Sequence, residues 1–425
     1  MSASDRGAHE PLTSVEICAG AGGQAIGLHQ AGFRHLALVE IDKYACATLR
    51  ENVRKDPEWA GCEVLEEDLK EFGPGHVMAA LRNPREEKGR PLVEGELDLL
   101  AGGVPCPPFS VAGMQLGADD DRDLFPQMLH LVRTLRPKAV LIENVRGILD
   151  KKFDAYRAGI ISELRDEKYV FCGWRLLEAR NYGVPQLRPR AILIAVREDV
   201  MKGTEKFPWP LGVSEPPADL YEELRPEMLR RRNVLRKRFP ERQADINEAY
   251  RRWQKKAKLR ARVAPTLVGG SKKHGGADLG PNRAKASWRH FGVNAMGVAN
   301  EPEKTTDLAR DFLRLTGPML TVQQAAIVQS FPKDWRFAGG KTAKYRQVGN
   351  AFPPPVARAL GRAIASVLRP EQRDQLLEKL EIEYASVEQA DEERYVQPSF
   401  YDEADVSPVS TPALDHGEDL VGAGI

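Results

Sequence analysis

The chain has 425 residues, a hydrophobic share of 42% and a formal net charge of +1, so its charge identifies no partner. The length predicts two domains with a sizeable core. Five cysteines without CxxC spacing argue against a disulfide framework and a zinc site, and we expect no metal. No apolar run approaches the roughly 18 residues that span a membrane. The first eleven residues lack the apolar core of a signal peptide, so we expect a cytoplasmic protein.

Short apolar runs alternate with helical patterns through the first half of the chain. The predicted strands are rich in Val, Ile and Leu without strict alternation, as in a parallel sheet that is buried on both faces. They cover residues 15–18, 36–41, 97–101, 139–143 and 191–196. Helices are predicted between them at 24–31, 43–54 and 124–135. This rhythm predicts a doubly wound α/β domain in residues 1–199.

The pattern changes after residue 199. Residues 200–315 contain clustered prolines and a Gly-rich stretch at 269–280, and they predict a second, smaller and irregular domain. Within it, residues 225–262 carry fifteen Lys or Arg against four acids. This basic bias favours a polyanionic partner, although a solvated helix face explains it equally well.

The α/β character returns in residues 316–370, where a helix is predicted at 355–367. Residues 371–425 then carry fifteen acids against three bases. We expect this acidic tail to be largely disordered, above all from about residue 385, because it is also poor in apolar residues.

A Gly-rich turn and two acids predict a nucleotide-like ligand. The sequence Ala-Gly-Ala-Gly-Gly at 19–23 follows the first strand, where glycines permit a tight turn and a close backbone approach. Glu40 ends the second strand and suits two ribose hydroxyls, and Asp68 could accept from an adenine amino group. Each acid alone could be a helix cap or a surface charge. Their order after successive strands favours the ligand.

Three further features gather at predicted strand ends. Cys106 stands in Gly-Gly-Val-Pro-Cys-Pro-Pro-Phe-Ser, a turn-like loop that suits a nucleophile better than the usual buried packing of cysteine. Glu143 ends the fourth strand and is expected to reach the same crevice. Arg188 and Arg190 stand on alternate residues of an extended segment and point the same way, so at least one can reach it.

In this order the motifs resemble those of DNA cytosine-5 methyltransferases. The resemblance includes Glu-Asn-Val at 143–145, Gln-Leu-Arg-Pro-Arg at 186–190 and Tyr-Arg-Gln-Val-Gly-Asn-Ala-Phe-Pro-Pro at 345–354. It covers about residues 14–364. It implies a Rossmann-like methyltransferase domain that uses S-adenosylmethionine, with residues 200–315 as a target-recognition domain for double-stranded DNA. We expect a monomer, since one catalytic domain and one recognition domain suffice to enclose a duplex. A possible further partner is a cognate restriction enzyme that acts on the same site without direct binding.

The resemblance assigns roles by motif position. Cys106 takes the nucleophile position, Glu143 the acid position and Arg190 the position that orients the substrate, and Arg188 joins this catalytic set. The residues implied in cofactor binding are Cys18, Ala19, Gly20, Gly22, Gly23, Glu40, Ile41, Asp68, Leu69, Pro105, Leu124, Asn350 and Ala351.

Some positions depart from the family pattern. Cys18 replaces a usual phenylalanine beside the adenine, and Val104 and Pro107 replace a proline and a glutamine around Cys106. Gln324 and Ile327 replace a glutamate and an arginine that are structural in the family, which affects local packing rather than activity.

The expected reaction adds the Cys106 thiolate to C6 of a cytosine that is flipped out of the duplex, with residues 110–123 as a mobile lid. The nearest alternative is the relative that methylates cytosine in transfer RNA. That group carries a Cys-Phe-Thr signature, which is missing here, and lacks a large recognition domain. A catalytically silent DNA-binding protein and a dehydrogenase are further alternatives. The first leaves Cys106 and Glu143 unexplained, and the second leaves the closing motif at 345–354 unexplained.

Overall fold

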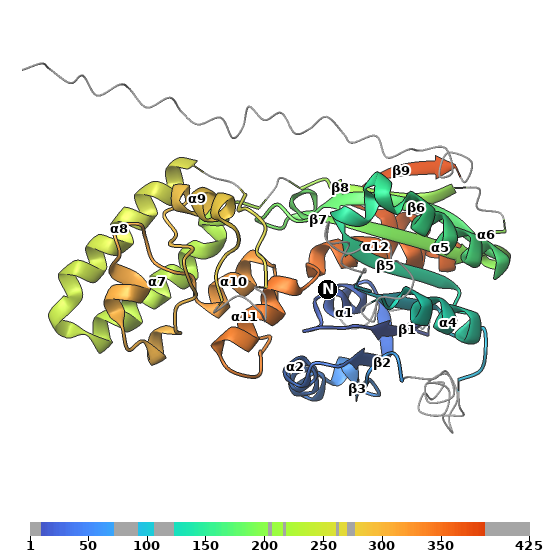
Figure 1. The fold of residues 1–425 in the computed structure, drawn as a ribbon, viewed down its shortest axis with the longest axis horizontal. Coiled ribbons are helices and arrows are strands. Elements are labelled where there is room, and N and C mark those ends of the chain that lie inside the picture. The colour runs from blue at the N-terminus through green and yellow to red at the C-terminus, as the bar shows by residue number, and fades with distance from the viewer. Residues whose placement is uncertain are drawn as a thin grey trace, which may run out of the picture.

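The computed structural model describes residues 10–71, 92–105, 123–202, 206–215, 218–260, 263–269 and 277–386. A part that contains the β-sheet (the sheet part) and a part that contains α7, α8 and α9 (the helical part) lie side by side, as Figure 1 shows. Cys106 and all but Asp123 of the expected lid lie outside the described residues. Within the described part, no helix is long and apolar enough to cross a membrane.

A seven-stranded sheet forms the first part, in the order β3-β2-β1-β4-β5-β7-β6. The strands are β1 (Leu12–Ile17), β2 (Phe33–Glu40), β3 (Glu63–Glu66), β4 (Leu99–Gly102), β5 (Ala139–Val145), β6 (Tyr169–Glu178) and β7 (Pro189–Arg197). The five strands from β3 to β5 run parallel, whereas β7 is antiparallel to both β5 and β6. All five predicted strands are confirmed. The sequence prediction gave no bounds for β3, which it implied only as a strand that ends before Asp68, and it missed β6.

Helices cover both faces of the sheet, as the α/β prediction requires (Figure 1). They are α1 (Gly23–Gln30), α2 (Lys43–Lys55), α4 (Phe125–Leu135), α5 (Asp154–Asp166), α6 (Glu198–Met201) and α12 (Pro354–Leu368). On one face α1 and α12 pack together so closely that a Cβ on Gly27 would lie 2.3 Å from the Pro354 carbonyl oxygen. Apolar side chains of α4 and α5 fill the other face.

Two predicted boundaries are wrong. Strand β8 (Lys206–Val213) pairs antiparallel with β9 (Leu380–Ser386). Phe207 and Trp209 of β8 are buried in the same core as α12, so this segment belongs to the sheet part rather than to the domain predicted from residue 200. The predicted tail from 371 likewise begins with ordered structure, because α13 (Arg373–Leu377) and β9 occupy its first residues.

The second part contains more regular structure than its composition indicated. This part contains α7 (Leu220–Arg238), α8 (Gln243–Arg260) and α9 (Asn282–His290). Leu224, Met228 and Leu235 form a buried stripe along α7 at helical spacing, although many charged residues obscure it in the sequence. Ion pairs between neighbouring turns support both long helices, as in Arg252–Glu248 on α8.

Between the two parts lie α10 (Val322–Val328) and α11 (Lys341–Asn350), visible in orange in Figure 1. Short 3-10 turns are Pro57–Trp59, Arg146–Leu149, Lys151–Phe153, Ala179–Tyr182, Pro240–Arg242, Pro302–Lys304 and Pro370–Gln372. Residues Ala309–Leu313 form one π-helical turn.

Candidate active site

A cavity of about 260 Å³ lies where the parallel strands end. Its walls come from the carboxyl ends of β1, β2, β4 and β5, the start of α1, and α11 with the residues after it. This edge is where α/β sheets hold ligands, because loops from neighbouring parallel strands meet there. Seven predicted cofactor residues line it: Cys18, Ala19, Gly20, Gly23, Glu40, Asn350 and Ala351.

Six other predicted cofactor residues are not among its lining residues. Leu69 is buried and Leu124 half-buried in the core of the sheet part, and Gly22 precedes α1 in a left-handed conformation. Asp68 accepts a hydrogen bond from the Lys70 backbone, and Pro105 is exposed. Ile41 has 63% of its surface exposed directly after Glu40.

The Gly-rich turn has a tight backbone that only glycine permits at key positions. Gly20 has φ +54°, and Gly22 has φ +86°. A Cβ on Gly23 would lie 2.2 Å from the Phe352 carbonyl oxygen, so this position holds the first turn of α1 directly against the residues after α11. The Gly-rich turn and the closing motif therefore lie against each other and form one wall of the cavity.

Glu40 ties two loops of the pocket together. Its Oε2 accepts a hydrogen bond from the Gly20 backbone N–H at 2.7 Å. Its Oε1 accepts from the backbone N–H groups of Ile41 and Asp42, at 2.9 and 2.8 Å. The carboxylate is therefore held at the rim in a fixed position, as a ribose-binding acid requires.

Glu143 also lines the cavity, and it is paired with Arg190. Arg190 Nε lies 2.6 Å from Glu143 Oε1, and both side chains are largely buried. The contact follows from the register of the sheet, in which Val145 of β5 pairs with Arg190 of β7. A charge-assisted contact of this length fixes the carboxyl group beside Gly103 at the end of β4.

Asn144 has a positioning role that the sequence did not reveal. Its Nδ2 donates to the Val104 carbonyl oxygen at 2.8 Å, which fixes the start of the loop that carries Cys106. Asp123 anchors the chain where it leaves the expected lid, because its carboxylate accepts from the Tyr156 hydroxyl at 2.7 Å.

The four described cysteines are free and poorly suited to nucleophilic attack. Burial raises the thiol pKa of each to about 12, and nearby carboxylates add to this at Cys18, Cys46 and Cys62. A thiol attacks as its thiolate, so these four stay protonated and inert at neutral pH.

The comparisons with known proteins agree with this arrangement. The family model for "C-5 cytosine-specific DNA methylase" matches residues 12–366. The chain belongs to this family.

Named relatives make the assignment more specific. Type II methyltransferase M.NaeI of Lentzea aerocolonigenes is 44% identical over 85% of this chain and 76% of its own length. Type II methyltransferase M.NgoMIV of Neisseria gonorrhoeae is 42% identical over 85% of this chain and 99% of its own. The chain is therefore a DNA cytosine-5 methyltransferase of the Type II restriction-modification kind.

Solved structures share the fold at low sequence identity. The methyltransferase EhMeth of Entamoeba histolytica is 15% identical, has a TM-score of 0.52, and matches over 85% of this chain and 99% of its own. A DNMT2 mutant of Spodoptera frugiperda is 17% identical, has a TM-score of 0.51, and matches over 83% and 99%. At such identities the likeness shows the Rossmann-like fold alone.

The methyltransferase holds its two predicted arginines in different surroundings. Arg188 is buried and donates to the carbonyl oxygens of Leu267 and Gly349, at 2.7 and 2.8 Å. Burial and the neighbouring Arg190 hold the pKa of Arg188 well below its usual value. Arg188 therefore joins the segment before the Gly-rich stretch to α11. Both terminal nitrogens of Arg188 are used on backbone carbonyls, which favours a structural role over the predicted catalytic one.

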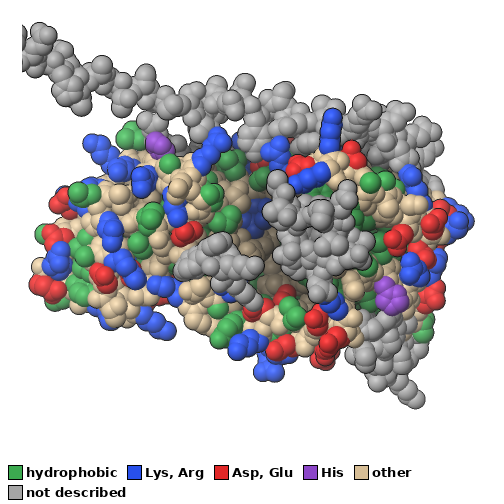
Figure 2. All heavy atoms as spheres, in the orientation of Figure 1, with side chains coloured by type: hydrophobic (Ala, Val, Ile, Leu, Met, Phe, Trp, Pro, Cys, Tyr) green, Lys and Arg blue, Asp and Glu red, His purple; other side chains and the backbone are tan. Residues whose placement is uncertain are grey.

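Many of the basic side chains of the methyltransferase serve its own helices. Arg231 is fully buried and donates to the carbonyl oxygens of Met319 and Asp311. Ion pairs within the helical part are Arg225–Glu222, Arg230–Glu227, Arg230–Glu303, Arg242–Asp245 and Arg252–Glu248. Figure 2 shows acidic and basic side chains intermingled over this part. The basic run is thus only partly available to a polyanion.

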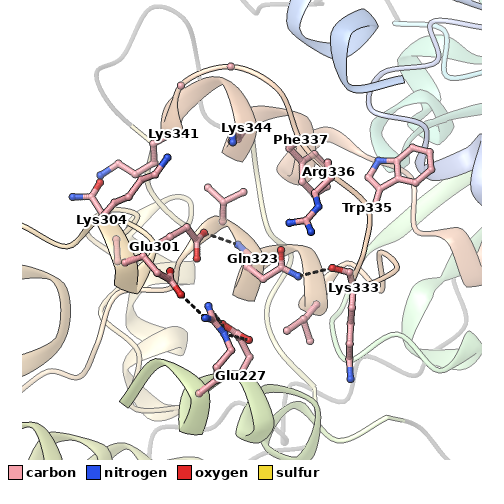
Figure 3. Close-up of a pocket in the computed structure, with 18 of the residues that line it drawn as sticks. Glu227, Glu301, Lys304, Gln323, Lys333, Trp335, Arg336, Phe337, Lys341 and Lys344 are labelled. Atoms are coloured by element: carbon pink, nitrogen blue, oxygen red, sulfur yellow. Dashed lines mark hydrogen bonds and ion pairs between the residues drawn. The ribbon is translucent and has the colours of Figure 1, made fainter. Parts of the chain in front are cut away.

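A larger cavity of about 810 Å³ lies on the other side of α11, between α7, α10 and the loop before α11 (Figure 3). Glu301 accepts from the Gln323 backbone there, and Gln323 donates to the Lys333 carbonyl oxygen. Lys341 and Lys344 line this cavity, whereas Asn350 on the same helix lines the smaller one. No predicted site residue lines the larger cavity, so its size does not make it the active site.

Proposed function

We propose that this methyltransferase transfers a methyl group from S-adenosylmethionine to C5 of a flipped cytosine in a specific duplex DNA sequence, through the thiolate of Cys106. The observation that carries the proposal is the single cavity that joins the Gly-rich turn and Glu40 to the Glu143–Arg190 pair. One end of this cavity suits a nucleoside and the other a reacting base.

The residues fit S-adenosylmethionine. Nothing lies within 4 Å of the position that a Cβ on Gly20 would take, which leaves room for close approach of a ligand. The fixed Glu40 carboxylate suits ribose hydroxyls, and exposed Ile41 offers an apolar surface for adenine. Asn350 adds an amide at the far wall. When bound, S-adenosylmethionine supplies an electrophilic methyl group on a sulfonium. The chain itself has to bring a cytosine to that group and activate it.

Activation requires a nucleophile because C5 of an aromatic cytosine attacks poorly. Addition of the Cys106 thiolate to C6 breaks the aromaticity and makes C5 enamine-like. The four other cysteines are excluded by the raised pKa values of their thiols, which supports Cys106 as the nucleophile. Asn144, through Val104, fixes the backbone two residues before Cys106.

Glu143 is proposed to stabilise the charge that builds at N3 of the ring, by a shared or donated proton. Such acid catalysis is typically worth about 10²- to 10⁴-fold in rate. Arg190 holds the Glu143 carboxyl in place. We propose that its positive charge also favours the thiolate form of Cys106. After methyl transfer, loss of the C5 proton expels the thiolate and restores the aromatic ring.

The target base has to leave the stack, because C6 is out of reach within a duplex. The hollow between the sheet part and the helical part in Figure 2 is the place where we propose that DNA binds. Relatives named Type II methyltransferases, at 42–44% identity, favour DNA over transfer RNA as the substrate. A protective role beside a restriction enzyme follows from the same relatives and remains part of the proposal.

Covalent trapping tests the proposal. Duplex DNA that carries 5-fluorocytosine is incubated with S-adenosylmethionine and either the wild type or Cys106→Ser. Fluorine at C5 blocks the final elimination, so a denaturant-resistant adduct is expected in the wild type alone. An adduct on transfer RNA but not on DNA would refute the choice of substrate. An adduct that persists in Cys106→Ser would refute the nucleophile.

A further inference from the structure

The larger cavity beside α11 is lined by cations that the surrounding described residues do not neutralise. Its volume of about 810 Å³ lies within the roughly 300–1,000 Å³ of small-molecule sites. Besides Arg230, the cations in its lining are Lys304, Lys333, Arg336, Lys341 and Lys344. Within the part of the chain that the structure describes, none of these five side chains forms an ion pair. The cavity therefore favours an anionic ligand.

The acids of the same cavity lie on a different side of it. They are Glu223, Glu227, Glu301 and Glu303. Arg230 pairs with both Glu227 and Glu303, at 2.8 and 2.6 Å, and Glu301 accepts from the Gln323 backbone N–H at 3.1 Å. Figure 3 shows Glu227 beside α7, whereas Lys341 and Lys344 lie at α11 across the cavity. An anion at α11 therefore meets cations first.

The start of α11 concentrates the positive charge. Gly340 caps this helix without a side-chain hydrogen bond, and the first turn contains no acid. Lys341 and Lys344 stand three residues apart, so they share one face of the helix, and both are half-buried. Burial and the neighbouring Arg310 lower the pKa of Lys341, because no described anion offsets its charge fully. Free backbone N–H groups and the helix dipole add to the attraction for an anion.

The floor of the cavity is apolar. It includes Val322, Ile327, Trp335 and Phe337, and both aromatic residues keep 8% of their surface exposed. A bare phosphate would leave this surface uncovered. A ligand with an aromatic ring beside its anionic groups matches both the floor and the cationic rim, and a nucleotide has this combination.

The floor is also connected to the cofactor cavity. Trp335 Nε1 donates to the Ala21 carbonyl oxygen at 3.0 Å, and Ala21 lines the smaller cavity. Helix α11 likewise contributes Lys344 to the larger cavity and Asn350 to the smaller one. A ligand in the larger cavity would thus contact two walls of the smaller cavity from behind without entering it.

We propose that the larger cavity binds a nucleoside polyphosphate as an effector. Its phosphates lie at the start of α11, between Lys341 and Lys344, and its base lies against Trp335 and Phe337. By holding Trp335 and α11, the nucleotide tightens the binding of the methyl donor. This last effect rests on the proposed use of S-adenosylmethionine, whereas the nucleotide site itself does not.

Calorimetric titration of the full chain tests the site. The probes are uridine triphosphate, whose pyrimidine separates it from the adenosine of S-adenosylmethionine, together with tripolyphosphate and uridine. We expect uridine triphosphate to bind with a Kd below about 100 µM, and tripolyphosphate at least about fivefold more weakly. Uridine should show no binding at about 1 mM.

Variants test the two lysines. Lys341→Gln and Lys344→Gln should each weaken uridine triphosphate roughly 3- to 20-fold, as for one lost hydrogen bond to a charged group. The matched control is Lys255→Gln, which removes the same charge from an exposed position on α8 outside the cavity and should stay within about twofold. Saturating uridine triphosphate should strengthen S-adenosylmethionine about 2- to 5-fold in the wild type and less in the two cavity variants.

The outcomes separate the site from the proposed function. No binding of uridine triphosphate, or equal affinity in the cavity variants and the wild type, would overturn the site. Displacement by S-adenosylmethionine would place the nucleotide in the cofactor cavity and overturn it too. Equal affinity for tripolyphosphate would overturn the nucleotide assignment. If uridine triphosphate binds but leaves S-adenosylmethionine unchanged, the effector role is wrong. If S-adenosylmethionine does not bind at all, the proposed function fails while the nucleotide site stands.

Discussion

Replacement of Arg188 should lower the free energy of unfolding rather than impair the chemical step directly. In Arg188→Met the carbonyl oxygens of Leu267 and Gly349 lose their donors in the buried interior. Each such loss costs about 1–3 kcal/mol, so two give roughly 2–6 kcal/mol. Removal of a fully desolvated guanidinium offsets part of this. We therefore expect the free energy of unfolding to fall by about 2–4 kcal/mol.

Urea denaturation measures this change, with the fluorescence of the six tryptophans as the signal. The matched variant is Arg190→Lys, two residues away, which keeps a positive charge beside Glu143 but loses the planar geometry of Arg190. It should change the unfolding free energy by less than about 1 kcal/mol while turnover drops. The reasoning is refuted if Arg188→Met unfolds like the wild type and yet has lost turnover, because Arg188 would then act in catalysis.

Three further substitutions test other parts of the site. Gly23→Ala places a Cβ against the Phe352 carbonyl oxygen, and this overpacking costs about 1–3 kcal/mol. The affinity for S-adenosylmethionine should therefore fall roughly tenfold or more in a titration. An unchanged affinity would contradict the close contact. Asn144→Leu leaves the Val104 carbonyl oxygen without its donor, so the rate of adduct formation on 5-fluorocytosine DNA should fall while cofactor affinity holds; equal loss of both would point to general damage. Glu16 takes up a proton on folding because its pKa is raised, so the stability of the ligand-free protein should fall as pH rises above about 4.5, the ordinary pKa of the unfolded chain. In thermal unfolding, Glu16→Gln should make the Tm less dependent on pH and should raise it at neutral pH. A lower Tm at every pH would contradict the burial of an unpartnered carboxyl.

The sequence predicted the parallel core well because burial on both faces leaves a direct trace in composition. The runs of Val, Ile and Leu in β4 and β5 have no other simple explanation. Strand β6 escaped notice because Gly173 and Arg175 interrupt its apolar residues, and half of its side chains are only half-buried. Helices α7 and α8 escaped because ion pairs between turns, rather than a broad apolar face, dominate their composition.

In the candidate site, residues at strand ends could be predicted from the sequence, whereas residues that depend on tertiary contacts could not. Glu40 and Glu143 could be predicted because each ends a strand at the ligand edge of the sheet. The two arginines could not be told apart, since both stand on one extended face and only tertiary contacts separate them. Glu16 and Gln24 were not predicted, because burial beside a cavity leaves no trace in the sequence.

Transfer of a labelled methyl group tests the central claim most directly. Duplex DNA of broad sequence is incubated with S-adenosylmethionine labelled on the methyl group, and the nucleosides are separated after digestion. The account predicts label in 5-methylcytosine with the wild type and none with Cys106→Ser. Label on a different base or at a different atom of cytosine, or undiminished label with Cys106→Ser, would contradict it.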